Sequence, residues 1–261
     1  MLEGFEQSTF TSEGTTHEVF RTGTGPAVIV IHEIPGVTPA VADFGRRVAS
    51  IGCTAVLPSL FGEPGQPISI PYVMKSAAQG CVSKEFATWA TGKTSPATVW
   101  LRALARSAHE ECGGPGVGAV GMCFTGGFAL AMAVDPSVVA PVLSQPSLPF
   151  SLSKRHRADP GVSAEDLARV VMRTRDDDLC MIGLRFTGDR LAPPERFETL
   201  RRALGDAFIS VEIDSSPGNP HGIKEKAHSV LTEDLQDEPG HPTRDALELV
   251  LEHFRSRLLP T

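Results

Sequence analysis

The sequence of 261 residues predicts an α/β protein with a doubly wound, mostly parallel sheet and helices on both faces. Two observations support this prediction. Six short runs are almost entirely apolar, which is typical of strands covered on both faces, whereas half-exposed strands alternate with polar residues. Segments with helical periodicity separate these runs, and regular alternation of strand and helix indicates a parallel sheet.

The predicted strands and the segments that flank them account for most of the chain. The six apolar runs lie at residues 27–33, 54–61, 117–122, 138–144, 179–188 and 207–214. The opening stretch "TFTSEGTTHEVFRTGTG" predicts antiparallel edge strands. Residues 62–97 are rich in Pro, Gly and Ser, so we expect an irregular cap or connection over one end of the sheet. Because no repeat or shift in composition marks a boundary, residues 1–261 are expected to form one domain.

Capping residues and apolar stripes predict the helices between the strands. Thr38 and Pro39 are suited to begin a helix that Gly52 ends. Ser163, with Asp166 three residues later, resembles a capping box. Apolar residues at helical spacing predict three further helices through Trp100, Leu101 and Leu104, through Phe197, Leu200 and Leu204, and through Leu247, Val250, Leu251, Phe254 and Leu258.

Composition narrows the range of partners. The chain has 24 basic and 31 acidic residues, and the resulting net charge of -7 disfavours nucleic acid as a partner. No apolar run approaches the roughly 18 residues that a membrane span needs. The N-terminus also lacks the basic and apolar regions of a secretory signal. We therefore expect a cytoplasmic protein, monomeric or a small homo-oligomer, that acts on a small molecule.

Cysteine spacing and glycine spacing predict neither a metal nor a cofactor. The five cysteines, at positions 53, 81, 112, 123 and 180, are odd in number and scattered, which argues against a disulfide framework. They include no C-x-x-C pair of the kind found in structural zinc sites. The sequence also contains no phosphate-binding glycine loop and no local cluster of metal ligands.

One cysteine lies at a predicted strand-to-helix junction, in "VGAVGMCFTGGFAL". A nucleophile elbow is a tight turn of this kind, with small residues two positions before and after the nucleophile. Gly121 meets the first requirement for Cys123, whereas Thr125 stands at the second position and two glycines follow it. A free cysteine is more often a buried small apolar residue, but this junction favours a nucleophile.

A cysteine nucleophile reacts as its thiolate, so it needs a base, and the base is oriented by an acid. In proteins with a nucleophile elbow the chain order is nucleophile, acid, histidine. Asp189 follows the strand predicted at 179–188 and therefore fits the acid. His221 and His228 both precede the last predicted helix, with His228 the nearer, and both are candidates for the base.

Acyl transfer also needs backbone N–H donors for the oxyanion of the tetrahedral intermediate. We expect one from Phe124, directly after the nucleophile, and one from Ile34 in the loop after the strand predicted at 27–33. Glu33 in the same loop ends an apolar run, and a carboxylate in such a place must be paired or functional. A salt bridge or a helix cap is the alternative role for Glu33.

These segments together resemble the dienelactone hydrolase family, from about residue 27 to residue 258. The resemblance lies in "VIVIHEIPGV", "TAVLPSLFG", "GAVGMCFTGGFAL", "GDRLAPPERF" and "AHSVL". It implies an α/β-hydrolase-type fold that cleaves a small ester or lactone through an acyl-thioenzyme. It also implies a triad of Cys123, His228 and Asp189, which favours His228 over His221. Glu33 is then expected to contact the resting thiol until substrate displaces it.

The sequence departs from that family where substrate would bind. Family members hold an anionic lactone with arginines, one of them four residues after the catalytic histidine, where this chain has Thr232. Residues 62–97 contain no arginine, although Lys75, Lys84 and Lys93 could replace one. A neutral or differently shaped ester or lactone is therefore the alternative to dienelactone.

Two other functions are compatible with parts of this pattern. A thiol sensor or ligand-binding protein on the same fold would need Cys123 and Glu33, but not Asp189 and His228 together. An amidotransferase-like cysteine site would need a His-x-Glu pair near the C-terminus, which "HPTRD" does not supply.

Overall fold

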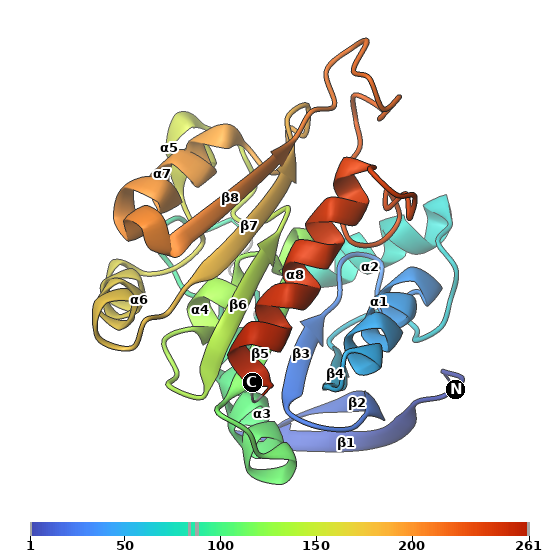
Figure 1. Cartoon of the computed structure of the whole chain (residues 1–261), viewed down its shortest axis with the longest axis vertical. Helices are drawn as coiled ribbons and strands as arrows, with labels where there is room; N and C mark the ends of the chain where they lie inside the picture. Colours follow the sequence, from blue (N-terminus) through green and yellow to red (C-terminus); the bar gives the residue numbers. More distant parts are fainter. Residues whose placement is uncertain (1, 83–84, 87–88, 260–261) are drawn as a thin grey trace.

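A computed structural model describes residues 2–82, 85–86 and 89–259. Its strands form one eight-stranded sheet in the described residues, in the order β1-β2-β4-β3-β5-β6-β7-β8 (Figure 1). They are β1 (Glu6–Ser12), β2 (Thr15–Gly23), β3 (Ala27–Ile31), β4 (Thr54–Ser59), β5 (Val117–Met122), β6 (Val138–Ser144), β7 (Met181–Phe186) and β8 (Phe208–Ile213). β1 and β2 are antiparallel, and all strands from β3 to β8 run parallel. The predicted fold class is confirmed.

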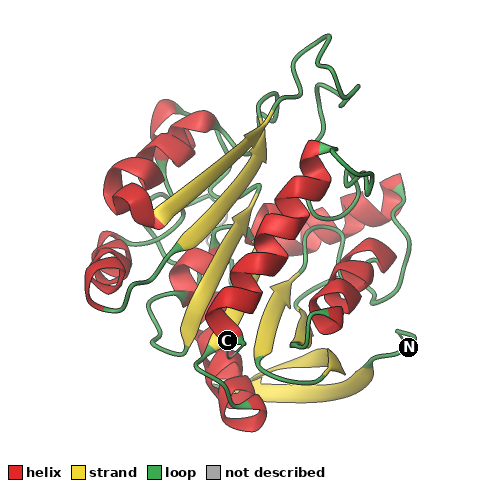
Figure 2. Ribbon diagram, in the orientation of Figure 1, coloured by secondary structure: helices red, strands yellow, loops and turns green. Residues whose placement is uncertain are grey.

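Helices cover both faces of the sheet (Figure 2). One face carries α1 (Pro39–Ser50) and α8 (Pro242–Leu258). The other carries α3 (Ala97–Cys112), α4 (Phe128–Met132), α6 (Ala164–Asp176) and α7 (Pro194–Leu204). The shorter pieces are α2 (Ile70–Val82), α5 (Lys154–Ala158) and the 3-10 turns η1 (Cys123–Thr125) and η2 (Gly205–Ala207). Among the described helices, none combines the length and hydropathy that a membrane crossing requires.

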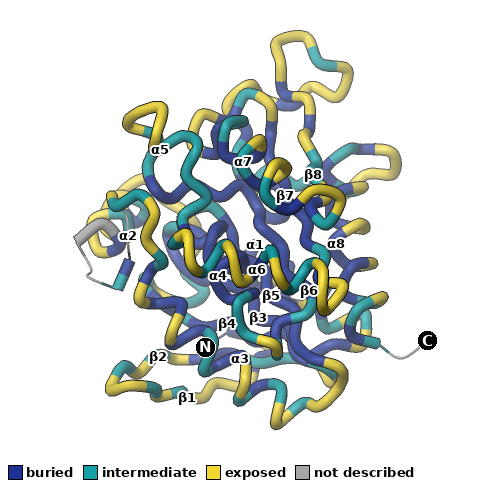
Figure 3. The backbone as a smooth tube through the Cα atoms, turned by 90° about the vertical axis from the view of Figure 1, so that its left-hand side faces the viewer, coloured by how far each residue is buried: buried dark blue, intermediate teal, exposed yellow. Residues whose placement is uncertain are grey.

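The apolar core has two parts, one on each side of the sheet. Trp100 and Phe197 belong to the part under α3 and α7, and Phe44 and Phe254 to the part under α1 and α8. Figure 3 shows the buried chain running through the middle of the molecule, with exposed residues on the outer loops. Both parts of the core therefore rest on the same central strands.

The helix caps agree with the sequence in one case and only partly in the other. The Thr38 side chain accepts a hydrogen bond from the Val41 N–H (3.3 Å), and α1 begins at Pro39, directly after Thr38. The Ser163 side chain likewise accepts from the Asp166 N–H (3.1 Å). The reciprocal bond of a capping box is absent there, because the Ser163 N–H donates to the Thr94 hydroxyl (3.0 Å) instead.

Residues 62–97 are not irregular throughout, because α2 occupies 70–82. Over positions 70–80, where burial is described, the buried residues are Tyr72, Ser76 and Gly80, so one large apolar residue marks the inward face there. Gly80 lies against the Phe124 ring, where an added Cβ would sit 3.1 Å from Phe124 Cζ. The helix was missed because close packing against a ring requires small residues, which leave no apolar stripe in the sequence.

The prediction that every strand is covered on both faces is wrong for β8. It is the last strand of the sheet and pairs only with β7 among the described strands. Ile209 is 40% exposed, and the carboxylate of Glu212 forms ion pairs with Arg185 and Arg201. The strand predicted at 179–188 is also shorter than expected, since β7 covers only Met181–Phe186.

The strand order determines where a site can form. The chain leaves β3 for β4 on one side, whereas it leaves β5 for β6 on the other. β3 and β5 are neighbours, with Ile31 paired to Gly121. In open parallel sheets, ligands bind outside the carboxyl ends of the strands at such a reversal of direction. Glu33 and Cys123 each follow one of these two strands, so they meet at that point.

Candidate active site

Cys123 occupies a strained turn between β5 and α4. Its φ of 52° lies in the left-handed region, which costs a non-glycine residue of order 1–3 kcal/mol. The turn is tight on both sides. An added Cβ at Gly121 would lie 2.2 Å from the Thr125 carbonyl oxygen, and one at Gly126 would lie 2.5 Å from Pro146 Cα. The geometry is that of a nucleophile elbow, so the glycines are required by the close approach of backbone.

Thr125, which stands where the elbow pattern has glycine, has a structural role of its own. Its hydroxyl accepts a hydrogen bond from the Met122 N–H (3.1 Å). The same oxygen lies 3.0 Å from the Ile31 carbonyl and 3.1 Å from the His32 carbonyl, to which it can donate. Thr125 therefore fastens the turn that carries Cys123 to the end of β3.

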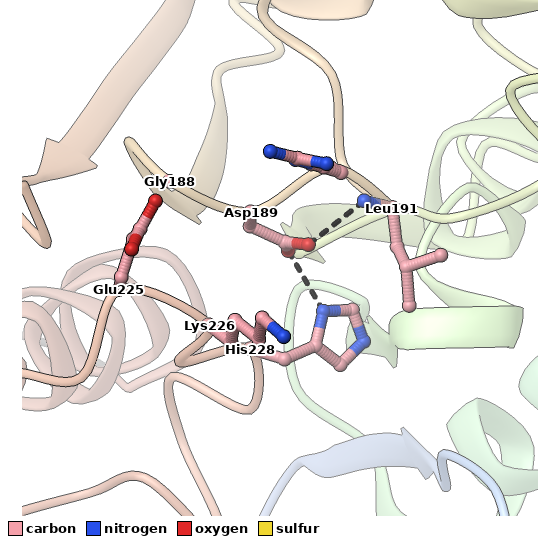
Figure 4. Close-up of a pocket in the computed structure, with 7 residues that line it drawn as sticks. Gly188, Asp189, Leu191, Glu225, Lys226 and His228 are labelled. Carbon is pink, nitrogen blue, oxygen red and sulfur yellow. Dashed lines mark hydrogen bonds and ion pairs between the residues drawn. The ribbon is translucent and has the colours of Figure 1, made fainter.

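Asp189 and His228 form a direct contact across two loops (Figure 4). His228 Nδ1 lies 2.7 Å from Asp189 Oδ2, and the other carboxylate oxygen accepts from the Leu191 N–H (2.9 Å). The Asp189 side chain is almost fully buried. Since a carboxylate accepts from Nδ1–H, it fixes the neutral tautomer in which Nε2 carries the lone pair.

The loop that carries His228 is held by the half-buried carboxylate of Asp234, a residue that the sequence did not suggest. Asp234 Oδ2 accepts hydrogen bonds from the N–H groups of His228 (2.8 Å) and Ser229 (3.0 Å). This pattern resembles an Asx cap, with the acceptor placed after the segment it holds rather than before it. His221, the other candidate, lies in an exposed part of the preceding loop, with its ring 5.4 Å from that of His241.

The electrostatic surroundings of His228 favour its charged form. Burial lowers the pKa of an imidazole, and it is the largest single influence here. The negative charge of Cys123, together with the hydrogen bond and charge of Asp189, outweighs burial and raises the pKa of His228 well above 6.5. A histidine in this setting can hold the proton taken from a thiol.

Glu33 is buried, with 2% of its surface exposed, and is bound by neutral donors. Ser229 Oγ donates to Oε2 (2.7 Å), and Thr232 donates a short hydrogen bond to Oε1. The side-chain amide of Gln145 lies 3.4 Å from Oε2. Within the described residues no Lys, Arg or His forms an ion pair with Glu33, so the alternative role as a salt bridge is not seen there.

Glu33, Cys123 and His228 come together although they are far apart in the sequence. One ligand atom from each lies within 4.8 Å of the others. Among the described residues, these three are the one group of three or more His, Cys, Asp or Glu side chains placed closely enough to hold a metal ion. Because the three belong to three different loops, sequence spacing gave no indication of a cluster.

Gln145 is the site-forming residue that sequence analysis missed most completely. It follows β6, is fully buried and has a φ of 35°. Its side-chain oxygen lies 3.4 Å from the Val230 N–H, and its backbone N–H donates to the Leu184 carbonyl (2.7 Å). Gln145 thereby links Glu33, the histidine loop and the end of β7. A glutamine before Pro146 carries no motif, and only the positive φ and full burial identify it.

His32 is a second buried polar residue that supports the site. Its Nε2 accepts from the Leu60 N–H (3.0 Å), and its Nδ1 lies 2.9 Å from the Glu33 carbonyl. Burial lowers the pKa of His32 to about 4, so the ring is neutral. It joins the loop after β3 to the loop after β4, and it fixes the backbone at Glu33.

Ile34 and Phe124, the two residues predicted as oxyanion donors, lie just after the adjacent strands β3 and β5. Ile34 follows Glu33 after β3, and Phe124 follows Cys123 after β5. Ile34 and Cys123 pack against the same apolar cluster as Phe61. That the N–H groups of Ile34 and Phe124 act as oxyanion donors stays a prediction.

A group of aromatic rings surrounds Phe124, the residue that follows Cys123. Phe124 contacts the rings of Phe61, Phe86 and Phe150 at centroid distances of 5.6, 5.2 and 6.4 Å. Trp89, which is 53% exposed, lies 5.0 Å from Phe150. The contacts of Phe124 are edge-to-face, and the rings form a mainly apolar wall in the cluster against which Cys123 packs.

On the other side of His228 lies a cleft of about 510 Å³. It is lined by Gly188, Asp189, Arg190, Leu191, Glu225, Lys226 and His228 (Figure 4). The lysines expected to replace family arginines do not line it. Lys75 is ion-paired with Glu63 (2.9 Å), Lys93 is exposed, and Lys84 lies outside the described residues.

Known proteins have sequences similar to this chain. The sequence model of the dienelactone hydrolase family matches residues 16–258. Proteins of Salmonella typhi and Salmonella typhimurium, assigned provisionally as carboxymethylenebutenolidases, are 28% identical over 205 residues, which is 77% of this chain and 68% of each relative.

Solved structures show the same fold. A protein of Klebsiella pneumoniae, described provisionally as a dienelactone hydrolase, aligns with a TM-score of 0.64 and 22% identity, over 96% of this chain and 97% of that one. A dienelactone hydrolase-like promiscuous phosphotriesterase from metagenomic libraries aligns with a TM-score of 0.61 and 16% identity, over 97% and 98%. Because the family match spans nearly the whole sequence, this chain belongs to the dienelactone hydrolase family and is a hydrolase of carboxylic esters or lactones.

Proposed function

We propose that this hydrolase cleaves a small ester or lactone through an acyl-thioenzyme, with Cys123 as nucleophile, His228 as base and Asp189 as the residue that orients the base. The observation that carries the proposal is the 2.7 Å hydrogen bond between Asp189 and His228, with His228 coupled to a cysteine at a strained elbow. A histidine held by a buried carboxylate beside a thiol is the arrangement that nucleophilic catalysis requires.

The proposed reaction has two steps. The Cys123 thiolate attacks the ester carbonyl, a C–S bond forms, and the oxyanion accepts hydrogen bonds from the N–H groups of Ile34 and Phe124. The C–O bond then breaks, and the leaving alkoxide takes the proton held by His228. In the second step His228 removes a proton from water, the hydroxide attacks the thioester, and the C–S bond breaks to release the acid and the thiol.

Two features bear on the proposed substrate. The ring wall of Phe61, Phe86 and Phe150 favours an apolar group beside the reacting carbonyl. At position 232, where family members have an arginine, the threonine donates to Glu33 and offers no positive charge to a substrate. We therefore propose a partly apolar ester or lactone of another shape than dienelactone, with Arg190 and Lys226 as the cationic side chains of the cleft beside His228.

A thiol sensor on the same fold is the competing proposal. A sensor needs a reactive thiol, but it gains nothing from a second carboxylate that fixes the histidine tautomer. The buried Asp189–His228 pair therefore favours turnover over sensing.

Hydrolysis of a panel of short activated esters and unsaturated lactones tests the proposal. Wild type is compared with Cys123→Ala, and Cys112→Ala serves as a matched control because Cys112 lies at the end of α3, in another part of the molecule. We expect turnover in wild type and the control, and a loss of at least 10³-fold in Cys123→Ala with unchanged circular dichroism. Equal activity in all three proteins would exclude the Cys123 mechanism.

A further inference from the structure

We infer that Glu33, Cys123 and His228 form a binding site for a borderline-soft divalent cation such as Zn²⁺, which inhibits the enzyme reversibly. The three residues offer a carboxylate oxygen, a thiolate and an imidazole nitrogen, which are the ligand types that zinc prefers. Their ligand atoms already lie within 4.8 Å of one another. With zinc bonds of about 2.0–2.3 Å, tetrahedral ligands are roughly 3.3–3.8 Å apart, so side-chain shifts of about 1 Å complete the site.

Each ligand is backed by a partner that leaves its metal-binding atom available. Asp189 accepts from His228 Nδ1, and this carboxylate–histidine pair is the outer-shell arrangement of many zinc sites. The ring therefore presents Nε2 toward a metal. Ser229 and Gln145 hydrogen-bond to Oε2 of Glu33 and Thr232 to Oε1, which orients the carboxylate and leaves Oε1 a second lone pair for a metal.

The charge of the site also favours a dication. Glu33 is buried, and only hydroxyl and amide groups are hydrogen-bonded to it. A buried carboxylate is costly and a thiolate next to it adds a second negative charge, of which the charged form of His228 offsets only one. Zn²⁺ would neutralise both charges. Thr232 matters here, because a guanidinium at that position would compete with the metal for Glu33.

Binding would be stoichiometric and would need no redox partner. Zinc forms bonds to the Cys123 sulfur, to Nε2 of His228 and to one oxygen of Glu33, and the Cys123–His228 pair releases its proton to solvent. The fourth position remains open to water, as in sites with three protein ligands. The nucleophile and the base are then both occupied, so hydrolysis stops until the metal is removed.

Metal binding can be measured without any assay of hydrolysis. The full-length protein is titrated with Cd²⁺, whose thiolate complex has an ultraviolet charge-transfer band, and with Zn²⁺ in a calorimeter. We expect one metal per chain in wild type, no charge-transfer band in Cys123→Ser, and a Kd raised by about 10–100-fold or more in Glu33→Gln. Cys112→Ser and Glu248→Gln make the same chemical changes outside the site and should bind as wild type does.

Thr232→Val provides a second test in case Glu33→Gln fails to fold. It removes a hydrogen bond to the carboxylate but no ligand, so we expect a Kd raised by about 10-fold. A missing band in wild type, a band retained in Cys123→Ser, or a Kd unchanged in both Glu33→Gln and Thr232→Val would each overturn the inference. Inhibition and its reversal by a chelator rest on the proposed hydrolysis, whereas the binding measurements do not, so failure of one is distinguishable from failure of the other.

Discussion

The chemistry of this site depends on how a few residues are held. Cys123 has a positive φ that places it at the tip of the turn. Gly121 and Gly126 let neighbouring backbone atoms come closer than a Cβ at either position would allow. His228 is shifted toward its charged form by Cys123 and Asp189 against the effect of burial. We therefore predict that the charge of His228 depends on the Cys123 thiol.

Replacing Cys123 by Ala should lower the pKa of His228. The substitution removes the charge and the hydrogen bond that Cys123 supplies, while burial, which lowers the pKa, remains. The pKa is measured from the ring resonances of His228 by NMR titration in wild type and in Cys123→Ala. Cys112→Ala should leave it unchanged. If the pKa is the same in all three proteins, the proposed coupling between thiol and imidazole does not exist.

The raised pKa also makes stability depend on pH with a definite sign. Because the folded pKa of His228 lies above the ordinary 6.5, the stabilisation from its charge is complete below about pH 6.5. It is lost as the pH rises through the folded pKa. The difference in free energy of unfolding between wild type and His228→Gln should therefore be larger at pH 6 than at alkaline pH. Denaturant titrations would contradict this if the difference grew with pH.

At the scale of elements, buried polar side chains hold the loops that follow the parallel strands. Gln145 links the ends of β6 and β7 to the histidine loop. Arg196, in α7, is fully buried and donates to the carbonyls of Pro149 (2.7 Å) and Asp159 (2.6 Å). Burial lowers the pKa of Arg196 to about 10, which leaves it charged at neutral pH. Hydrogen bonds to backbone therefore help to fix these loops, in addition to the packing of Leu148 and Phe150 against the core.

Arg196→Met should destabilise the protein by about 3 kcal/mol or more. The substitution keeps an unbranched apolar side chain but leaves several buried carbonyls without a donor. Arg201→Met, in the same helix, removes a partly exposed ion pair with Glu212 and should cost at most about 1 kcal/mol. Urea unfolding measures both, and equal costs would show that the buried hydrogen bonds of Arg196 contribute little.

Residue patterns predicted the elements whose inward faces are apolar and missed those that are not. β5 and β6 have the predicted bounds, because uninterrupted apolar runs bounded by glycine or proline leave few alternatives. α2 was missed since it packs through Ser76 and Gly80. In the site, the residues named beforehand belong to motifs, whereas Gln145 acts through contacts between distant loops. Such contacts have no local signature in a sequence.

At the scale of the whole molecule, one sheet carries both layers of helices that the structure describes. The α1–α8 layer and the α3–α4–α7 layer pack on opposite faces of the same strands, and the site lies where the loops of β3, β5, β7 and β8 converge. Loss of either layer would expose the strands that the other covers. We therefore propose that residues 1–261 form one domain.

A single domain should unfold in one cooperative transition. Thermal unfolding followed by far-ultraviolet circular dichroism and by tryptophan fluorescence should give coincident curves, because Trp100 packs in the layer under α3. Two separated transitions would instead indicate two independent units.

Light scattering on the same sample measures the oligomeric state, for which we propose a monomer or a small homo-oligomer.

The most direct test of the central claim is to trap the covalent intermediate. At alkaline pH, where a thiol ionises without a base, His228→Asn should keep a nucleophilic Cys123 but lack the base that activates water, so the acyl group from an activated ester should accumulate on the protein. Intact-protein and peptide mass spectrometry after mixing should show one acyl group, located on the peptide that contains Cys123, and none in the double variant that also carries Cys123→Ala. An acyl group on another residue, or hydrolysis by wild type that persists in Cys123→Ala, would contradict the assignment of Cys123 as the nucleophile.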